Sequence, residues 1–451
     1  MFKYIPNTDD DISKMLEKIG VESVDDLFSD IPESLRLQKP LNLPAPLSEI
    51  ELERELKEIS SKNADASEYK YFTGGGAYNH YIPSIVNHLI SRAEFYTAYT
   101  PYQPEVSQGT LQGIFEYQTM ISDLLEMDLA NASMYDGASA FAEAVLMSSR
   151  IRKKGNKVLI PKSLNPAYRQ VMDTYTNNTG IKVIEIPYNK QGQLDLDFLK
   201  NNLDNETISV SVQNPNYFGC IEDLSSIAEV LKQGKSFLIG IVTEALSLGL
   251  LKSPGHYGAD ILVGEGQSLG IPVSFGGPYL GLFASKKEYM RQVPGRLCGE
   301  TLDTDGKRGF VLTISTREQH IRREKATSNI CSNQGLCALM TAIYMSTMGK
   351  QGMREVATIN LQKANYAREK IRNVKGYELV FETPSFNEFL VKCPKPTQDI
   401  NRKLLENKMV GGLDISCYYP ELSDCMLFTM TELVSKDDID RLCEILEEVA
   451  K

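Results

Sequence analysis

Short hydrophobic runs alternate with amphipathic stretches between about residues 110 and 290. Runs rich in Val and Ile predict strands at 157–160, 181–186, 207–213, 236–242, 260–263 and 280–284. The stretches between them have helical periodicity and predict helices over 111–127, from 166 and over 223–233. Strands and helices that alternate in this way predict right-handed crossovers and a mostly parallel sheet.

The first seventy residues have a charged, helical pattern. A helix is predicted from Asp9 to Ile19, because Gly20 follows as a C-cap. A second helix is predicted after Ser48, which forms a capping box with Glu51. Between them, residues 36–46 contain three prolines and predict an extended segment. We expect residues 1–70 to form an arm that packs on another surface.

The pattern changes again after residue 310. A long helical region is predicted from 315 to 349, followed by strands at 378–381 and 388–393 and a closing helix at 436–450. We therefore predict a large α/β domain over 71–310 and a smaller α+β domain over 311–451. This layout is typical of the aminotransferase-like (fold-type I) pyridoxal phosphate enzymes, although a fold alone does not establish a function.

Composition narrows the possible partners. The net charge of −11 argues against nucleic acid or an anionic membrane as the main partner. No apolar run is long enough to span a bilayer, and the start lacks a signal core. Eight cysteines without a CxxC pair fit reduced thiols in a cytoplasmic protein. Four histidines without ligand spacing make a metal site improbable.

The stretch GEGQSLGIPVSFGGP, residues 264–278, follows a predicted strand and is arranged like an active-site loop. In pyridoxal enzymes a lysine in such a loop holds the cofactor as a Schiff base. Here no lysine lies between Lys252 and Lys286. A dinucleotide fingerprint is also disfavoured, because Leu269 stands where the third glycine is needed.

A second candidate site opens a predicted helix at Tyr135, Asp136, Gly137, Ala138 and Ser139. Small residues at a helix N-terminus allow backbone N–H groups to bind an anion such as phosphate. Asp136 also fits a simple N-cap. Both interpretations stay open at the level of the motif.

Two further stretches are rich in polar side chains. Residues 97–105 combine hydroxyl groups, an amide and two prolines, which predicts a rigid loop that is either a binding surface or a wedge between subunits. Binding is the favoured interpretation. The run from Arg317 to Lys325 has the charge pattern of a solvated helix face, which is the default for such a run.

Four long stretches resemble one family, the P-protein of the glycine cleavage system, in the alpha-type half of its split form. They are the sequences GGGAYNHYIPSIVNHLISRAEFYTAYTPYQPEVSQGTLQ, NASMYDGASAFAEA, GADILVGEGQSLGIPVSFGGPYLGLFA and REQHIRREKATSNICSNQ. The resemblance extends from about Arg36 to the C-terminus. It implies a pyridoxal phosphate enzyme that decarboxylates glycine and passes the aminomethyl group to the lipoyl arm of the H-protein.

The resemblance also implies how the two halves divide the work. The beta-type half carries the cofactor on a lysine, and counting back from the shared Gly-Gly-Pro turn places that lysine at Gln267 here. A carboxamide cannot form an imine, so we expect no covalent pyridoxal phosphate on this chain. Asn165 stands where a histidine stacks on the pyridine ring, and Glu244 is nearest to the carboxylate that pairs with the ring nitrogen. The remnant of a phosphate site then lies at Asp136, Gly137, Ala138 and Ser139. Whether it still binds a free anion stays open.

We therefore expect an alpha-type subunit that assembles with a beta-type subunit, as a heterodimer or heterotetramer. The complex is expected to act on glycine and on the lipoylated H-protein. Tyr99, Thr100, Tyr102 and Gln103 are expected to line the partner's active site. Two alternatives are a scaffold that only stabilises its partner and a stand-alone pyridoxal enzyme that uses another lysine. Lys252 is the nearest one, but it precedes the strand at 260–263. The role of the run from Arg317 to Lys325 does not follow from the resemblance.

Overall fold

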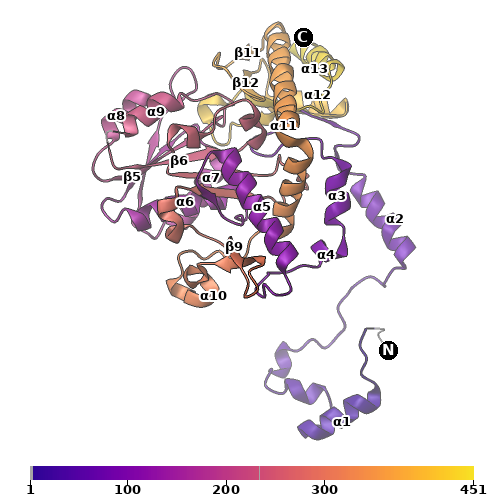
Figure 1. Cartoon of the computed structure of the whole chain (residues 1–451). Helices are drawn as coiled ribbons and strands as arrows, with labels where there is room; N and C mark the ends of the chain where they lie inside the picture. The colour runs from indigo at the N-terminus through magenta and orange to yellow at the C-terminus, as the bar shows by residue number, and fades with distance from the viewer. Residues whose placement is uncertain (1–3, 233) are drawn as a thin grey trace. The chain divides into compact units, whose positions relative to one another are not determined.

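The computed structural model describes residues 4–232 and 234–451 and contains two compact units, one that ends at Asn63 and one that begins at Ala64 (Figure 1). Each unit is described by itself. Residues 1–3 of the predicted arm and residue 233 of one predicted helix lie outside the described residues. No described helix is long and apolar enough to cross a membrane.

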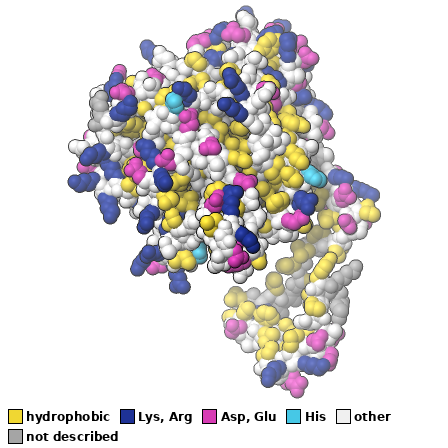
Figure 2. Space-filling model, viewed as in Figure 1, with side chains coloured by type: hydrophobic (Ala, Val, Ile, Leu, Met, Phe, Trp, Pro, Cys, Tyr) yellow, Lys and Arg dark blue, Asp and Glu magenta, His cyan; other side chains and the backbone are white. Residues whose placement is uncertain are grey.

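The N-terminal unit consists of helices without a buried face. Its elements are α1 (Asp9–Ile19), η1 (Asp25–Phe28), η2 (Glu33–Leu35) and α2 (Glu49–Ser60). Gly20 ends α1 in the left-handed conformation, and Ser48 and Glu51 form a capping box at α2, as predicted. None of the described residues of α1 or α2 is buried, and Figure 2 shows hydrophobic side chains on the surface of this unit. This unit therefore presents apolar helix faces without a core of its own.

The larger unit is built on a seven-stranded sheet in the order β2-β8-β7-β6-β5-β3-β4. Its strands are β2 (Leu129–Ala130), β3 (Lys157–Pro161), β4 (Lys182–Ile186), β5 (Thr207–Gln213), β6 (Phe237–Val242), β7 (Ile261–Glu265) and β8 (Gly281–Ser285). Strands β3 to β7 pair in parallel, and β8 runs antiparallel to both of its neighbours. All six predicted strands and the mostly parallel sheet are confirmed.

Helices cover both faces of this sheet. On one face, α6 (Gly137–Ile151) and α7 (Pro166–Thr176) share a core with alternate residues of β3, β6 and β7. On the other face lie α5 (Gln108–Leu125), α8 (Leu196–Asn202), α9 (Leu224–Leu231) and the first half of α11 (Gly335–Arg372). Shorter elements connect these layers: β1 (Lys70–Tyr71), α3 (Ser84–Ile90), α4 (Ala93–Tyr96), η3 (Ala245–Gly249), η4 (Pro254–Tyr257) and η5 (Lys287–Gln292).

The continuous helix predicted from residue 315 is wrong over its first twenty residues. An antiparallel hairpin of β9 (Leu297–Leu302) and β10 (Arg308–Thr313) precedes this region. The chain then forms only short turns, η6 (Ser315–Arg317), α10 (Gln319–Arg322) and η7 (Arg323–Lys325). Arg323 interrupts helical geometry with a φ of 52°. The long helix α11 begins only at Gly335.

Helix α11 contributes to two cores. Its first half packs in the core with α5 and the sheet, whereas residues near Ala364 and Ile371 pack in the C-terminal core. Gly349, with a φ of 58°, separates the two halves. The C-terminal core is completed by an antiparallel sheet of β11 (Glu378–Leu379), β12 (Glu388–Lys392), β15 (Cys425–Thr429) and β14 (Leu413–Asp414). The other elements of this region are α12 (Thr397–Glu406), η8 (Pro420–Leu422), α13 (Lys436–Ala450) and β13 (Met409–Val410), which pairs in parallel with β1. The predicted domain boundary at 310/311 stays a prediction.

Candidate functional site

The predicted cofactor residues lie where parallel strands end at their carboxyl edge, the usual place for a site in this kind of sheet. Asn165 follows β3, Glu244 follows β6 and Gln267 follows β7. A single segment, residues 75–80, contacts all three. Gly75 accepts a hydrogen bond from Asn165, Tyr78 pairs with Gln267, and His80 pairs with Glu244.

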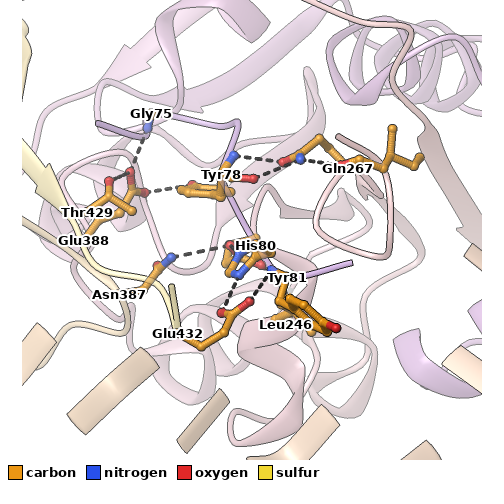
Figure 3. Close-up of polar contacts among 12 residues, drawn as sticks. Gly75, Tyr78, His80, Tyr81, Leu246, Gln267, Asn387, Glu388, Thr429 and Glu432 are labelled. Carbon is orange, nitrogen blue, oxygen red and sulfur yellow. Dashed lines mark hydrogen bonds and ion pairs between the residues drawn. The ribbon is translucent and has the colours of Figure 1, made fainter. Parts of the chain in front are cut away.

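The Gln267 carboxamide is buried, with 1% of its surface exposed, and all of its polar atoms are paired (Figure 3). Its Oε1 accepts the Tyr78 N–H at 2.8 Å, and its Nε2 donates to the Tyr78 carbonyl at 2.9 Å. The same Nε2 donates to the Ile271 carbonyl at 2.7 Å. The side chain therefore pairs with both backbone groups of Tyr78. A lysine ammonium has no acceptor and could not reproduce this arrangement.

Glu244 is also occupied by a neighbour. Its Oε2 lies 2.9 Å from Nε2 of His80, and the other ring nitrogen of His80 lies 2.8 Å from Glu432. Oε1 of Glu244 accepts the N–H of Leu246 at 2.9 Å. Burial alone would lower the pKa of His80, but the two carboxylates raise it to about 10. The imidazole is therefore a cation at neutral pH.

The helix start at 136–139 is a capping box. Asp136 accepts the N–H of Ser139 at 2.7 Å, which supports the cap interpretation of this motif. Gly137 donates its N–H to the Glu265 carboxyl group at 3.0 Å, and Ala138 is buried. Asn165 is likewise an N-cap, because its Oδ1 accepts the Ala167 N–H at the start of α7. The residues expected to hold phosphate and ring are thus engaged in local structure.

These residues do not fit pyridoxal phosphate. Gln267 has no amine for an imine, the carboxylate of Glu244 faces an imidazolium, and the first N–H of α6 is bound by Glu265. The space beside Gly137 is closed as well, since a Cβ added there would lie 2.0 Å from the Tyr168 hydroxyl. The site holds the polar partners that such a cofactor would require, but other groups of the chain already bind them.

The loop 97–105 lies apart from this buried network. Tyr99 and Thr100 line a pocket with residues from the first turns of α5 and α11, including Gly109, Gly113 and Leu336. Tyr102 is not among its lining residues. Its hydroxyl accepts a hydrogen bond from Arg296 at 3.1 Å, and its ring lies 5.2 Å from the ring of His320. Gln103 is exposed.

The default interpretation of the run from Arg317 to Lys325 is wrong for its first two residues. Arg317 and Glu318 are buried, and Glu318 lies 3.6 Å from Nε of buried Arg296. Arg296 also donates to Ser332, Asn333 and the Cys331 carbonyl. This guanidinium thus connects the 97–105 loop to the start of α11.

Several residues of the site were not identified from sequence. They are Tyr78, His80, Glu265, Arg296, Glu388 and Glu432. Their partners lie far away in the chain: Tyr78 donates its hydroxyl hydrogen to Glu388, 310 positions later, at 2.8 Å. The one signal available in the sequence is the glycine-rich and aromatic stretch at 73–83, part of the first stretch that resembles the family.

Comparison with known proteins places the chain. The sequence model of the family "Glycine cleavage system P-protein" matches residues 2–446. A relative from Desulforamulus reducens, "Probable glycine dehydrogenase (decarboxylating) subunit 1", is 51% identical over 99% of this chain and 100% of its own length. A relative of the same name from Anoxybacillus flavithermus is 51% identical over 99% of both chains.

Solved structures agree with these relatives. The crystal structure of a glycine decarboxylase (P-protein) of the glycine cleavage system in inhibitor-bound form superposes with a TM-score of 0.90 and 42% identity. It covers 99% of this chain and 100% of its own. A sphingosine-1-phosphate lyase from Burkholderia pseudomallei shares the fold alone, with a TM-score of 0.66 and 15% identity over 93% of both chains. The predicted fold class, aminotransferase-like α/β, is confirmed.

Proposed function

Because the chain belongs to the glycine cleavage system P-protein family, we propose that it is the alpha-type subunit of a two-chain glycine decarboxylase and carries no pyridoxal phosphate itself. A beta-type subunit, with a lysine at the position equivalent to Gln267, supplies the cofactor. The complex decarboxylates glycine, releases CO₂ and passes the aminomethyl group to the lipoyl arm of the H-protein.

The observation that carries this proposal is the state of Gln267. The side chain cannot form an imine, and its carboxamide is held by three hydrogen bonds in a buried position. In the same site Glu265 binds the N–H of Gly137, and His80 pairs with Glu244. These contacts support a cofactor that is held on another chain.

The contribution of this chain to that chemistry lies in the loop 97–105. Tyr99, which lines the pocket, is 86% exposed, and Tyr102 is 51% exposed, which is unusual for aromatic side chains. Their hydroxyl groups, with Thr100 and Gln103, offer donors that suit a glycine carboxylate and a site from which water is excluded. We place these four side chains at the entrance of the beta-type subunit's active site, across the subunit interface.

The stand-alone alternative requires another lysine at the site, and the nearest one, Lys252, is badly placed. Lys252 is exposed, pairs with His256 at 2.9 Å and precedes η4, so it lies before the amino end of β7. Gln267 follows the carboxyl end of the same strand. The scaffold alternative predicts assembly without any role for the 97–105 side chains, and variants of the loop separate it from the proposal.

The test is a reconstitution. The purified chain is incubated with pyridoxal phosphate, treated with borohydride and digested, and glycine-dependent CO₂ release is measured with the chain alone, the beta-type subunit alone and both together. We expect no reduced pyridoxyl peptide from this chain and turnover only with both chains. A pyridoxyl peptide from this chain, or turnover by it alone, contradicts the proposal.

A further inference from the structure

Three polar positions define a pyridoxal phosphate cavity in this type of sheet: a helix N-terminus for the phosphate, a carboxylate for the ring nitrogen and a lysine for the aldehyde carbon. In this chain the three positions are held by the start of α6, by Glu244 and by Gln267, which stands in place of the lysine. Each is paired with another group of the chain. These internal partners say more about the site than the missing lysine does.

Glu265 takes the position next to the helix N-terminus. One of its oxygens accepts the Gly137 N–H at 3.0 Å, and the other accepts the N–H groups of Gln267 at 3.1 Å and Leu280 at 2.9 Å. The carboxyl group is buried, and the Tyr168 hydroxyl closes the other side of Gly137. Glu265 is therefore a carboxyl group held by three backbone N–H donors, one of which is the first N–H of α6, where a phosphate would bind.

His80 takes the position that faces Glu244. Its cationic imidazole pairs with Glu244 at 2.9 Å, as a protonated pyridine nitrogen would, and pairs with Glu432 at 2.8 Å on its other side. The groups that face this ring are the two carboxylates and the Tyr78 ring, whose centroid is 6.1 Å away. The imidazolium is buried, with 2% of its side chain exposed.

The segment that carries His80 joins the large sheet to the C-terminal core (Figure 3). Tyr78 pairs with Gln267 of the large sheet through its backbone and with Glu388 of β12 through its hydroxyl. Gly75 donates its N–H to the same Glu388 at 2.7 Å. His80 then connects Glu244 to Glu432. The polar contacts of this segment thus run from the carboxyl edge of the large sheet, at Gln267 and Glu244, to Glu388 and Glu432 in the C-terminal part of the chain.

We propose that residues 74–81, together with Glu265, form a built-in replacement for the cofactor, which fills the cavity and fastens the C-terminal core to the large sheet. Glu265 substitutes for the phosphate, His80 for the ring nitrogen, and the backbone of Tyr78 binds the side chain that replaces the lysine. This inference goes beyond the proposed function and does not depend on the role of the 97–105 loop.

The first experiment opens the position of the phosphate. Glu265→Ala removes the carboxyl group, and Glu265→Gln keeps its volume as a matched control. Thermal unfolding of the full chain is followed in inorganic phosphate and in chloride of equal ionic strength. We expect phosphate to raise the Tm of Glu265→Ala by about 2 °C and to leave the unmodified chain and Glu265→Gln unchanged. An equal rise in the unmodified chain, or none in a folded Glu265→Ala, overturns the proposal.

The second experiment needs no change at Glu265 and remains informative if Glu265→Ala does not fold. The chain has four histidines, so the imidazole resonances can be assigned by single substitutions. We expect His80 to remain protonated at pH 8 in the unmodified chain and to titrate at a lower pH in Glu432→Gln. His88→Gln serves as the control on an exposed histidine. A neutral His80 at pH 8 overturns the substitution for the ring nitrogen.

Discussion

Two tyrosines show how differently this chain treats its two candidate sites. Tyr78, at the carboxyl edge of the sheet, is 1% exposed and has a partner for its hydroxyl and for both backbone groups. Tyr99, in the 97–105 loop, is 86% exposed beside a pocket. The edge that would normally carry the chemistry is closed by internal hydrogen bonds, whereas the loop offers its side chains outward. The sheet edge where an active site is expected in this fold is therefore not the place where this chain exposes polar side chains.

The strongest way to break the closed edge is Gln267→Lys. The substitution removes three hydrogen bonds and buries an ammonium in a site built for a carboxamide. We expect a loss of about 3–5 kcal/mol in the free energy of unfolding, measured by urea denaturation. Gln267→Met is the matched control without charge and should cost about 1–3 kcal/mol. A lysine variant as stable as the unmodified chain contradicts our account of the cavity.

The exposed loop is tested by turnover. In the reconstituted complex, we expect Tyr99→Phe and Tyr102→Phe each to reduce glycine decarboxylation by about 10²-fold, because each removes a donor from the active-site entrance. Assembly, measured by co-purification, should be unchanged. Tyr175→Phe on α7 is the control, since this tyrosine is also accessible but lies outside the loop. Full turnover by both loop variants favours the scaffold alternative.

The comparison is sharpened by treating the two tyrosines alike. Tyr78→Phe leaves the buried Glu388 without one donor, so we expect the free energy of unfolding to fall by about 1–3 kcal/mol. Turnover of the assembled complex should change little. Tyr99→Phe should change the stability of the isolated chain by less than about 0.5 kcal/mol. If the two variants show the same pattern in both measurements, the division between the closed edge and the exposed loop is wrong.

The smallest expected effect is a pH dependence of stability that arises at the closed edge. Burial raises the pKa of Glu265 to about 8 and that of Glu388 to about 7, and the two carboxylates beside His80 raise its pKa to about 10. Each group therefore binds more protons in the folded chain than in the unfolded chain across neutral pH. Stability must decrease as the pH rises from 6 to 9.

We expect the Tm to fall by a few degrees over this range. Glu265→Gln should flatten the decline, because the amide does not titrate. Glu288→Gln on η5 is the control, since this glutamate is exposed and does not belong to the network. A Tm that rises over the same interval contradicts the assignment of raised pKa values to these groups.

Local patterns predicted the fold well and the contents of the site only in part. The hydrophobic runs predicted the strands from β3 to β8, since their burial follows from composition alone. Gln267 was identified by its distance from a glycine turn. Its pairing with Tyr78 spans 189 positions and no local rule specifies it. The helix predicted through 317–325 failed because Arg317 and Glu318 are buried by tertiary contacts that override a charged pattern.

The full pairing of Gln267 also limits how this chain can change over generations. A lysine at this position alone would meet a cavity already filled by Tyr78 and Glu265, and it would weaken the fold before any catalytic benefit arose. Several substitutions would have to occur together for the site to accept a cofactor again. Folding stability itself therefore opposes the appearance of a cofactor lysine at this position.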